Sequence, residues 1–258
     1  MTDAQVTPQG RWAGRNTTKD ELRQEVWRAL EQKKLAIGPA FSRIPNFVGA
    51  DKAAARLAAL AIWQTARVVK ANPDPPQIPV RLRALQDGKL LYMPVPELTA
   101  DFPFLELDPR VLQQQGVALE VAATSEGAMQ HGKRVDWQEM QPYDLVVVGC
   151  VAVTRQGGRT GKGAGFADLE LGIMRVVGLV TPATPVVTTV HALQVVDDER
   201  VVMVAHDTPL DWVITPEEAI ETHTRYADPE GIDWASVQPD QYDNIPFLRA
   251  LRQRLSSA

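Results

Sequence analysis

The chain has 258 residues, enough for one large α/β domain or two small ones and for a substantial buried core. Hydrophobic residues make up 45% of the sequence and charged residues 23%, so extended disorder is excluded. The formal net charge of -5 excludes a general electrostatic attraction to nucleic acid or to an anionic membrane, and we expect neither as a partner.

Cysteine content and the N-terminal sequence bear on the cellular compartment. Cys150 is the only cysteine, so no internal disulfide can form, and we interpret it as a small buried residue in a reducing environment. The first 15 residues are polar, and no apolar run approaches the roughly 18 residues of a membrane span. We therefore expect a cytoplasmic protein.

The N-terminal part of the chain, residues 18–65, is predicted to be helical, whereas residues 1–17 are expected to be flexible. A capping box at Thr18–Glu21 opens a first helix, whose apolar stripe ends before Gly38. The alanine-rich stretch Asp51–Thr65 predicts a second helix.

Strands and helices alternate in the following part. The sequence predicts strands at Arg67–Lys70 and Lys89–Val95, with a helix at Val80–Leu85 between them. The proline-rich stretch Asn72–Pro76 predicts a rigid turn directly after the first of these strands. Residues 99–143 have weak periodicity and several turn signals, so we expect short helices and loops there.

The second half of the chain contains a strongly apolar strand, Asp144–Gly149, and further along a helix that begins near Phe166. Four short strands and a final amphipathic helix are predicted at Pro185–Val190, Leu193–Val196, Val201–Ala205, Trp212–Ile214 and Ile245–Leu255. We therefore expect residues 1–258 to form a single doubly wound α/β domain, with a mainly parallel sheet and N-terminal helices. In such sheets ligands bind at the carboxyl ends of the strands.

The loop Arg159–Asp168, with the sequence RTGKGAGFAD, has the most chemically specific composition in the chain. We expect it to join the apolar strand to the following helix. Glycines at positions 161, 163 and 165 allow positive φ and bring backbone N–H groups close to a ligand, and the helix directs its positive dipole end there. Lys162 and Arg159 would add full charges, so the loop predicts a site for a polyphosphate.

Two common nucleotide-binding patterns do not fit this loop. A Walker loop would need glycine in place of Gln156 and serine or threonine in place of Gly163. A Rossmann fingerprint would need its third glycine in place of Phe166. From the loop alone, a glycine-rich turn with a solvated lysine stays open as the alternative.

The order of the elements and the sequence of the loop resemble the 5-formyltetrahydrofolate cyclo-ligase family, also called methenyltetrahydrofolate synthetase, over most of the chain. The strongest match is the strand at 144–153 followed by residues 158–168, which are similar to the family's G-R-x-G-x-G-x-G-Y-Y-D loop. Further matches are Lys19 with Arg23, Leu91–Pro94, His206 with Asp207, and Asp211–Thr215. Residues 161–170, Arg43–Phe47 and Thr184–Thr188 resemble most the synthetase domain-containing branch.

This resemblance implies a fold of the NagB/RpiA/CoA-transferase type and a magnesium-ATP reaction on a small molecule, a reduced folate. In that reaction the γ-phosphoryl group of ATP passes to the formyl oxygen of 5-formyltetrahydrofolate, N10 attacks the activated carbon, and phosphate leaves as 5,10-methenyltetrahydrofolate forms. Such chemistry requires positioning and charge neutralisation. Each donor aimed at developing charge is typically worth about 2.7–4 kcal/mol. Assembly into a homo-oligomer is compatible with the sequence.

The resemblance also implies roles for matching residues. Phosphates would be held by Lys19, Arg23, Arg159 and Lys162, the last two acting in catalysis. Backbone donors would come from Gly161, Gly163 and Gly165. Asp168 would bind magnesium, His206 would assist proton handling, and Tyr92 and Phe166 would contact the substrate.

Each role has a structural alternative. Lys19 and Arg23, four residues apart, could form a solvated helix face. A carboxylate at Asp168 is favoured by the helix dipole by about 0.3–1 kcal/mol even without a metal. His206 could be a hydrogen-bonded residue at a strand end. The histidines at positions 131, 191 and 223 show no metal-ligand spacing, so no zinc site is expected.

Three departures from the family pattern leave the function open. Leu169 stands where cyclo-ligases commonly carry arginine, and Ala167 replaces the second aromatic residue of their loop. The stretch Pro94–Pro96 lacks the basic residue that often follows this proline. Two alternatives to a cyclo-ligase therefore stay open: an ATP-independent lyase, one-carbon releasing or C–C cleaving, on a non-folate substrate, and a non-catalytic nucleotide or folate binder.

Overall fold

The computed structural model describes residues 14–15, 17–99 and 102–256. Its α-helices are α1 (Thr17–Gln32), α2 (Ala50–Ala58), α3 (Ala61–Thr65), α4 (Ile78–Gln86), α5 (Pro109–Gln114), α6 (Leu119–Ala122), α7 (Ser125–His131), α8 (Phe166–Val176), α9 (Pro239–Asn244) and α10 (Pro246–Ser256). The flexibility expected for residues 1–17 mostly concerns residues outside these ranges. None of the described helices is long and apolar enough to cross a lipid bilayer.

Eight strands form one sheet in the order β11-β10-β8-β5-β1-β2-β3-β4. The strands of this sheet are β1 (Val68–Ala71), β2 (Leu90–Pro94), β3 (Phe104–Leu107), β4 (Lys133–Val135), β5 (Leu145–Val147), β8 (Val186–Thr189), β10 (Trp212–Ile214) and β11 (Ala219–Glu221). The strands from β10 to β2 are parallel, whereas β11, β3 and β4 pair antiparallel at the edges. The α/β class with a mainly parallel sheet is therefore confirmed.

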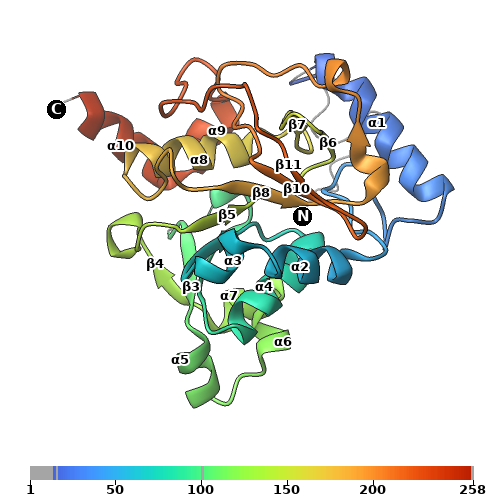
Figure 1. Ribbon diagram of the computed structural model, residues 1–258. Coiled ribbons are helices and arrows are strands. Elements are labelled where there is room, and N and C mark those ends of the chain that lie inside the picture. Colours follow the sequence, from blue (N-terminus) through green and yellow to red (C-terminus); the bar gives the residue numbers. More distant parts are fainter. Residues whose placement is uncertain (1–13, 16, 100–101, 257–258) are drawn as a thin grey trace.

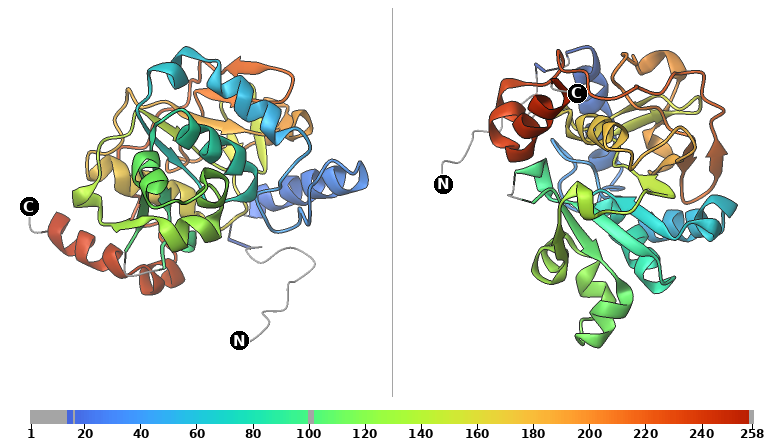
Figure 2. Two further views of the ribbon diagram at one scale, coloured as in Figure 1. Left: turned by 90° about the horizontal axis from the view of Figure 1, so that it is seen from below. Right: turned by 90° about the vertical axis from the view of Figure 1, so that its left-hand side faces the viewer.

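The two faces of the sheet are covered by different parts of the chain (Figure 1). Helices α2 and α4 to α7 lie on one face, where the small side chains of Ala53, Ala54 and Ala58 let α2 approach closely. The C-terminal helices α9 and α10 lie on the other face beside α8, as the right-hand view of Figure 2 shows. Because α4 connects β1 to β2 on one face and α8 precedes β8 on the other, the winding reverses between β1 and β5, which is where ligands bind in such sheets.

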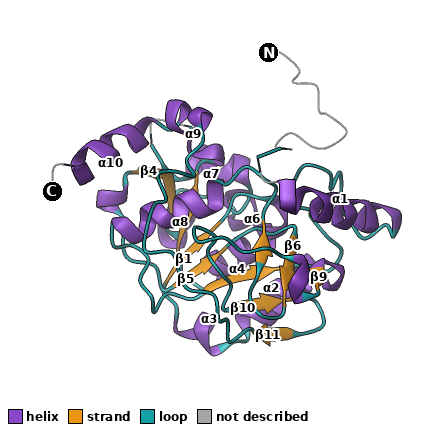
Figure 3. Ribbon diagram, turned by 90° about the horizontal axis from the view of Figure 1, so that it is seen from above, coloured by secondary structure: helices purple, strands orange, loops and turns teal. Residues whose placement is uncertain are grey.

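The central strands are buried on both sides by these layers. Figure 3 shows them beneath α8, and every residue of β1, β5 and β8 is buried. This explains why β5 is a continuous apolar run and why β1 and β8 do not alternate between apolar and polar residues. Cys150, just after β5, is 1% exposed, as expected, and burial raises the pKa of its thiol. Lys70 is the charged exception within β1, and it lies next to the candidate site.

A second, three-stranded sheet carries the glycine loop. It contains β6 (Ala152–Thr154), β7 (Arg159–Thr160) and β9 (Val195–Val196) in the order β7-β6-β9. Its apolar core also takes in Leu22, Val26 and Trp27 of α1. The loop therefore follows the β6–β7 hairpin, and not directly the strand β5 as the sequence suggested.

Other predicted elements also differ. The helix expected at Asp51–Thr65 is two helices, because the chain turns at Ala59 and Leu60. Residues 99–143 contain, besides short helices, the antiparallel strands β3 and β4. The strand expected at Leu193–Val196 begins only at Val195 and follows a 3-10 turn.

The strand expected at Val201–Ala205 is absent from the described structure, and this expectation is wrong. Val202 and Val204 are 47% and 41% exposed, so their β-branched side chains do not pack in a sheet. Instead the backbone N–H of Val204 donates to the carboxylate of Asp207 at 2.9 Å, which closes a turn.

Candidate functional site

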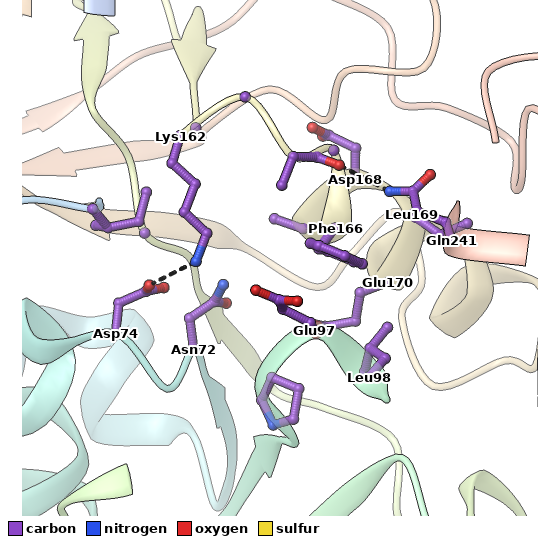
Figure 4. Close-up of a pocket in the computed structure, with 18 of the residues that line it drawn as sticks. Asn72, Asp74, Glu97, Leu98, Lys162, Phe166, Asp168, Leu169, Glu170 and Gln241 are labelled. Carbon is purple, nitrogen blue, oxygen red and sulfur yellow. Dashed lines mark hydrogen bonds and ion pairs between the residues drawn. The ribbon is translucent and has the colours of Figure 1, made fainter. Parts of the chain in front are cut away.

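A cavity of about 480 Å³ opens at the carboxyl ends of β1, β2 and β5, at the point where the winding of the sheet reverses. Its walls come from α1, from residues 72–75 after β1, from residues 94–98 after β2, from the glycine loop with the start of α8, and from residues 231–241. Figure 4 shows Lys162 and Phe166 of the glycine-loop wall and Glu97 of the wall after β2 facing the same opening. Segments far apart in the sequence therefore build one site.

The glycine loop has the backbone shape that its sequence predicted, except at one position. Gly163 and Gly165 have φ of 103° and 75°, a region that favours glycine. Gly165 is also the N-cap residue of α8. Gly161 does not have positive φ, so that part of the expectation is wrong, and a Cβ placed on it would meet nothing within 4 Å.

The N–H groups of the loop are available to a ligand. No described residue accepts a hydrogen bond from the backbone N–H groups of residues 161–165. The loop lines the cavity and continues into the N-terminus of α8, whose dipole favours negative charge. Unpaired donors at the N-terminus of a helix suit the oxygens of an anion.

Arg159 and Asp168 form a buried pair at the base of the loop. Arg159 is 2% exposed, its Nε donates to the carbonyl of Thr208 at 2.7 Å, and its guanidinium forms an ion pair with Asp168. Burial alone would lower the pKa of Arg159, but the carboxylate of Asp168 raises it above its ordinary value. The backbone N–H of Thr208 holds the same Asp168 oxygen at 2.9 Å. Arg159 thus orients the Asp168 carboxylate, whose side chain is 18% exposed at the cavity wall.

Lys19 and Arg23 lie on the inner face of α1. They are 3% and 4% exposed, so the alternative that they form a solvated helix face is wrong. Lys19 Nζ lies 2.5 Å from the carboxylate of Asp207. Arg23 donates to the carbonyl of Gly161 at 2.8 Å and to Asp20 at 2.6 Å, and burial lowers its pKa against the opposing effect of Asp20. Arg23 therefore ties α1 to the glycine loop.

Lys162 is the most accessible of the cavity's cations, with a side chain that is 31% exposed. Its Nζ lies 3.6 Å from Asp74 Oδ1, across the opening from the loop (Figure 4). This long contact is an ion pair rather than a good hydrogen bond. An incoming anion can therefore attract Lys162 without breaking a buried interaction.

The charges of the cavity nearly balance. Five basic side chains line it: Arg15, Lys19, Arg23, Arg159 and Lys162. Six acidic side chains line it: Asp74, Glu97, Asp168, Glu170, Asp207 and Asp233. Each basic side chain forms an ion pair with a carboxylate. A polyanion that binds here must displace some of these carboxylates or bring a cation of its own.

A second buried pair forms the floor of the cavity. Lys70 of β1 is fully buried and forms an ion pair with Glu170 of α8, and its Nζ donates to Asn72 at 2.7 Å. Burial raises the pKa of Glu170, although Lys70 opposes this effect. Asn72 and Glu170 both line the cavity, so this network presents a carboxyl group and an amide to any ligand.

The structure places His206 and Phe166 on the cavity wall. Nδ1 of His206 lies 3.3 Å from the carboxylate of Asp233. The two side chains are 34% and 43% exposed, so His206 is an accessible cavity residue rather than a buried strand-end residue. Phe166 is the first residue of α8 and lies half-buried beside the glycine loop.

Tyr92 is not part of this site, in contrast to the expected substrate contact. It is fully buried and does not line the cavity. Its hydroxyl donates to Glu106 at 2.8 Å and accepts from the backbone N–H of Gln141, and its ring packs 5.8 Å from Tyr143. Burial raises the pKa of Tyr92 above its ordinary value. The alternation of β2 turns this side chain into the core beneath the α8 layer, and the cavity is reached only after the strand ends.

Sequence reasoning missed several residues of the site: Asn72, Asp74, Glu97, Glu170, Asp233 and Gln241. A signal existed for the first two, because they follow a predicted parallel strand at its carboxyl end. Glu97 lies in a turn where it and Leu98 have φ of 59° and 55°, a strained backbone that the sequence does not reveal. Glu170 was missed because it lies between buried core residues of α8, and the helical spacing does not distinguish it from them.

The comparisons with known proteins agree on one family. The model of the 5-formyltetrahydrofolate cyclo-ligase family matches residues 15–216. The methenyltetrahydrofolate synthase domain-containing protein of Danio rerio is 39% identical over 240 residues, 91% of this chain and 62% of that protein. The Homo sapiens protein of the same name is 37% identical over 243 residues, 93% of this chain and 63% of that protein. The chain thus spans less than two thirds of the length of these relatives.

Among solved structures, the NMR structure of Aquifex aeolicus 5,10-methenyltetrahydrofolate synthetase aligns with a TM-score of 0.49 and 18% identity, over 80% of this chain and 95% of that one. The family model covers more than half of the chain, and relatives with more than 30% identity align with nearly all of it. The chain therefore belongs to the 5-formyltetrahydrofolate cyclo-ligase family.

Proposed function

We propose that this protein converts 5-formyltetrahydrofolate to 5,10-methenyltetrahydrofolate, or catalyses a close one-carbon reaction, with magnesium and ATP. The observation that carries the proposal is the glycine loop, whose unpaired N–H groups face a cavity next to Lys162 and Asp168. Membership of the family supports the reaction type. The cavity is large enough for a small-molecule substrate together with nucleotide phosphates.

The residues present fit magnesium-ATP. Loop N–H groups without protein partners suit phosphate oxygens, which accept hydrogen bonds. Magnesium is usually held by one or two carboxylates together with substrate phosphates, and Asp168 offers one carboxylate oriented by Arg159. Within the described ranges, no cluster of three or more His, Cys, Asp or Glu side chains could hold a metal, so the phosphates would supply the remaining ligands.

Bound ATP supplies the phosphoryl group that turns the formyl oxygen into a leaving group. Lys162, 31% exposed, would move its ammonium group from Asp74 to a phosphate oxygen. Asp168 would hold the magnesium, and the loop N–H groups would orient the phosphates. His206, paired with Asp233, is the accessible side chain that would accept or return a proton in the reaction.

The charge balance of the cavity supports the requirement for magnesium. The basic side chains are already paired with carboxylates, and acidic side chains outnumber them by one. Free ATP would face this excess of negative charge, whereas magnesium neutralises part of the polyphosphate. We therefore expect tight nucleotide binding only with magnesium.

The test is an assay of the purified protein with 5-formyltetrahydrofolate and magnesium-ATP. Appearance of the methenyl chromophore together with stoichiometric ADP supports the proposal, and EDTA is expected to stop both. If neither product forms in the presence of magnesium, the proposed reaction is wrong. Binding of magnesium-ATP without turnover would instead point to a non-catalytic nucleotide binder.

A second candidate is a lyase that needs no ATP, acting on a non-folate substrate by one-carbon release or C–C cleavage. The observation that favours it is the internal pairing of the cavity's cations, which leaves the site close to electroneutral. Leu169, where cyclo-ligases commonly carry arginine, is 8% exposed and packs in the core, so the charge is not replaced there. Turnover without nucleotide would establish this candidate, and magnesium-dependent ATP binding would count against it.

A further inference from the structure

The segment Asp228–Gln241 lies beyond the residues matched by the family model, and part of it forms a wall of the cavity. It contributes seven lining residues between 231 and 241. It approaches the glycine loop, α8 and His206, three features that carry the proposed function. This wall therefore belongs to the site, although the family pattern does not include it.

Gln241 makes the direct contact with the glycine loop. Its Nε2 donates to the carbonyl of Ala164 at 2.9 Å, and its Oε1 accepts from the backbone N–H of Gln238 at 2.9 Å. The residue is 2% exposed, so both ends of the amide are used within a buried space. If the amide were flipped, its NH2 group would face the N–H of Gln238 and its oxygen would face the carbonyl of Ala164. The two contacts therefore fix the orientation of the amide. Gln241 thus links the N-terminus of α9 to the loop.

Other contacts anchor the segment around Gln241. Asp228 forms an ion pair with Arg175 of α8 at 2.7 Å. Gly231 packs on the same helix so closely that a Cβ on Gly172 would lie 2.7 Å from its carbonyl oxygen. Arg15 donates to the Ala164 carbonyl at 3.3 Å and pairs with Asp240 at 2.5 Å. The Ala164 carbonyl therefore has two donors, one from each end of the chain.

The direction of the Ala164 carbonyl decides where the next N–H points. In a trans peptide the carbonyl of Ala164 and the N–H of Gly165 point in opposite directions. Gly163 and Gly165, on either side of Ala164, have positive φ, and glycine flips between conformations at little cost. A donor on the Ala164 carbonyl is therefore needed to select one orientation of this peptide plane.

We propose that Gln241 is a positioning residue that fixes the Ala164–Gly165 peptide, so that the N–H of Gly165 is presented to a bound polyphosphate. The identity of the polyphosphate as ATP rests on the proposed function, whereas the fixing of the loop does not. Without this hydrogen bond the peptide samples other orientations. The affinity for the polyphosphate is then reduced in proportion to the fraction of molecules whose peptide has the binding orientation.

The sharpest variant is Gln241→Glu. A glutamate keeps the acceptor for the Gln238 N–H, and so the cap of α9, but above its pKa it cannot donate to the Ala164 carbonyl and places an anionic oxygen against it. Gln241→Ala removes both contacts. Gln114→Glu, at an exposed site of α5, adds the same charge far from the loop and is the control.

Three measurements are made on the full chain at pH 7.5. Isothermal titration with magnesium-ATP is expected to give a Kd raised at least tenfold in Gln241→Glu, and unchanged in the control. In the assay, KM for ATP rises more than KM for the folate. At pH 5, where part of the glutamate is protonated and can donate, the ratio of variant to wild-type Kd is expected to shrink.

Hydrogen exchange of the amides at residues 161–168 without nucleotide is the third measurement, and exchange at least tenfold faster in Gln241→Glu supports the inference. Unchanged exchange in Gln241→Glu overturns it, as does a defect confined to Gln241→Ala, which would assign the effect to the α9 cap. If the wild-type protein binds no magnesium-ATP, the proposed function fails, and hydrogen exchange alone decides on the role of Gln241.

Discussion

The cavity has two charged regions of opposite character, the glycine-loop wall and the floor. On the wall, Lys162 is 31% exposed and lies 3.6 Å from its carboxylate partner. On the floor, Lys70 is fully buried and is held by both Glu170 and Asn72. Both are lysine–carboxylate pairs, yet only the first can change partners at small cost, because water and ligand reach it.

The difference shows which charges are available for chemistry and which specify the fold. An exposed pair is worth about 0–1 kcal/mol, so a ligand easily replaces it. Removing one partner of a buried pair costs several kcal/mol, because the other charge stays buried without compensation. We therefore expect substitutions on the wall to change function and substitutions on the floor to change stability.

The largest effect is expected from Lys70→Met. It leaves the Glu170 carboxylate buried without a cation, and we expect a loss of about 3–5 kcal/mol in the free energy of unfolding, measured by urea denaturation. The double variant Lys70→Met/Glu170→Gln removes both charges and is expected to recover most of this loss. If the free energy of unfolding of Lys70→Met lies within about 1 kcal/mol of the wild-type value, the distinction between wall and floor is wrong.

Lys162→Ala is expected to do the reverse. We expect kcat/KM of the proposed reaction to fall by roughly 10²–10³, equivalent to about 2.7–4 kcal/mol, while the free energy of unfolding changes by less than about 1 kcal/mol. Lys52→Ala, an exposed lysine on α2, is the matched control and should keep wild-type kinetics. Equal activity of the two variants would show that Lys162 does not act on the substrate.

The raised pKa of Glu170 predicts a pH dependence of stability specific to the floor. The folded state holds this proton more tightly than the unfolded state, whose glutamate has a pKa of about 4.3. Stability therefore falls as pH rises from that value to the folded-state pKa, by about 1.4 kcal/mol per unit of separation. The double variant Lys70→Met/Glu170→Gln is expected to lack this fall, and a parallel pH profile for both proteins would contradict the assignment.

The smallest effects on stability separate two glycines of the wall. Gly163→Ala forces a φ of 103° on alanine and should cost about 1–2 kcal/mol. Gly161→Ala meets no neighbour within 4 Å and needs no positive φ, so thermal denaturation should hardly change. If Gly161→Ala nevertheless weakens magnesium-ATP binding in titration calorimetry, the bare backbone there serves the ligand. Unchanged binding would mean that no phosphate approaches this residue.

Much of the fold could be predicted because local signals agree with the tertiary structure. The continuous apolar run Asp144–Gly149 indicated a strand buried on both faces, and β5 lies at the centre of the sheet. The antiparallel strands β3 and β4 were missed because their pairing depends on distant partners rather than on their own periodicity. The valines of Val201–Ala205 favoured a strand by their β-propensity. In the described structure Val202 and Val204 are exposed, and this segment pairs with no strand.

The site was predictable where the backbone itself demands certain residues. Positive φ at Gly163 and Gly165 leaves a mark in the sequence, because glycine is favoured there. Gln241 leaves no such mark, since its role comes from a contact with a carbonyl 77 positions away. Tyr92 lay in a recognisable motif, but the direction of its side chain depends on the strand alternation and on the helix packed above it.

The hydrogen bond between Gln241 and Ala164 also has a consequence for the order in which the site is completed during translation. At about 5–20 residues per second, the 77 positions between them take roughly 4–15 seconds to translate. During this interval the nascent chain has the glycine loop but lacks the wall that contains Gln241 and Asp240, the ion-pair partner of Arg15. If Gln241 fixes the loop as proposed, the anion site is completed only after Asp228–Gln241 has left the ribosome, and we expect a growing chain not to hold nucleotide until this segment has docked.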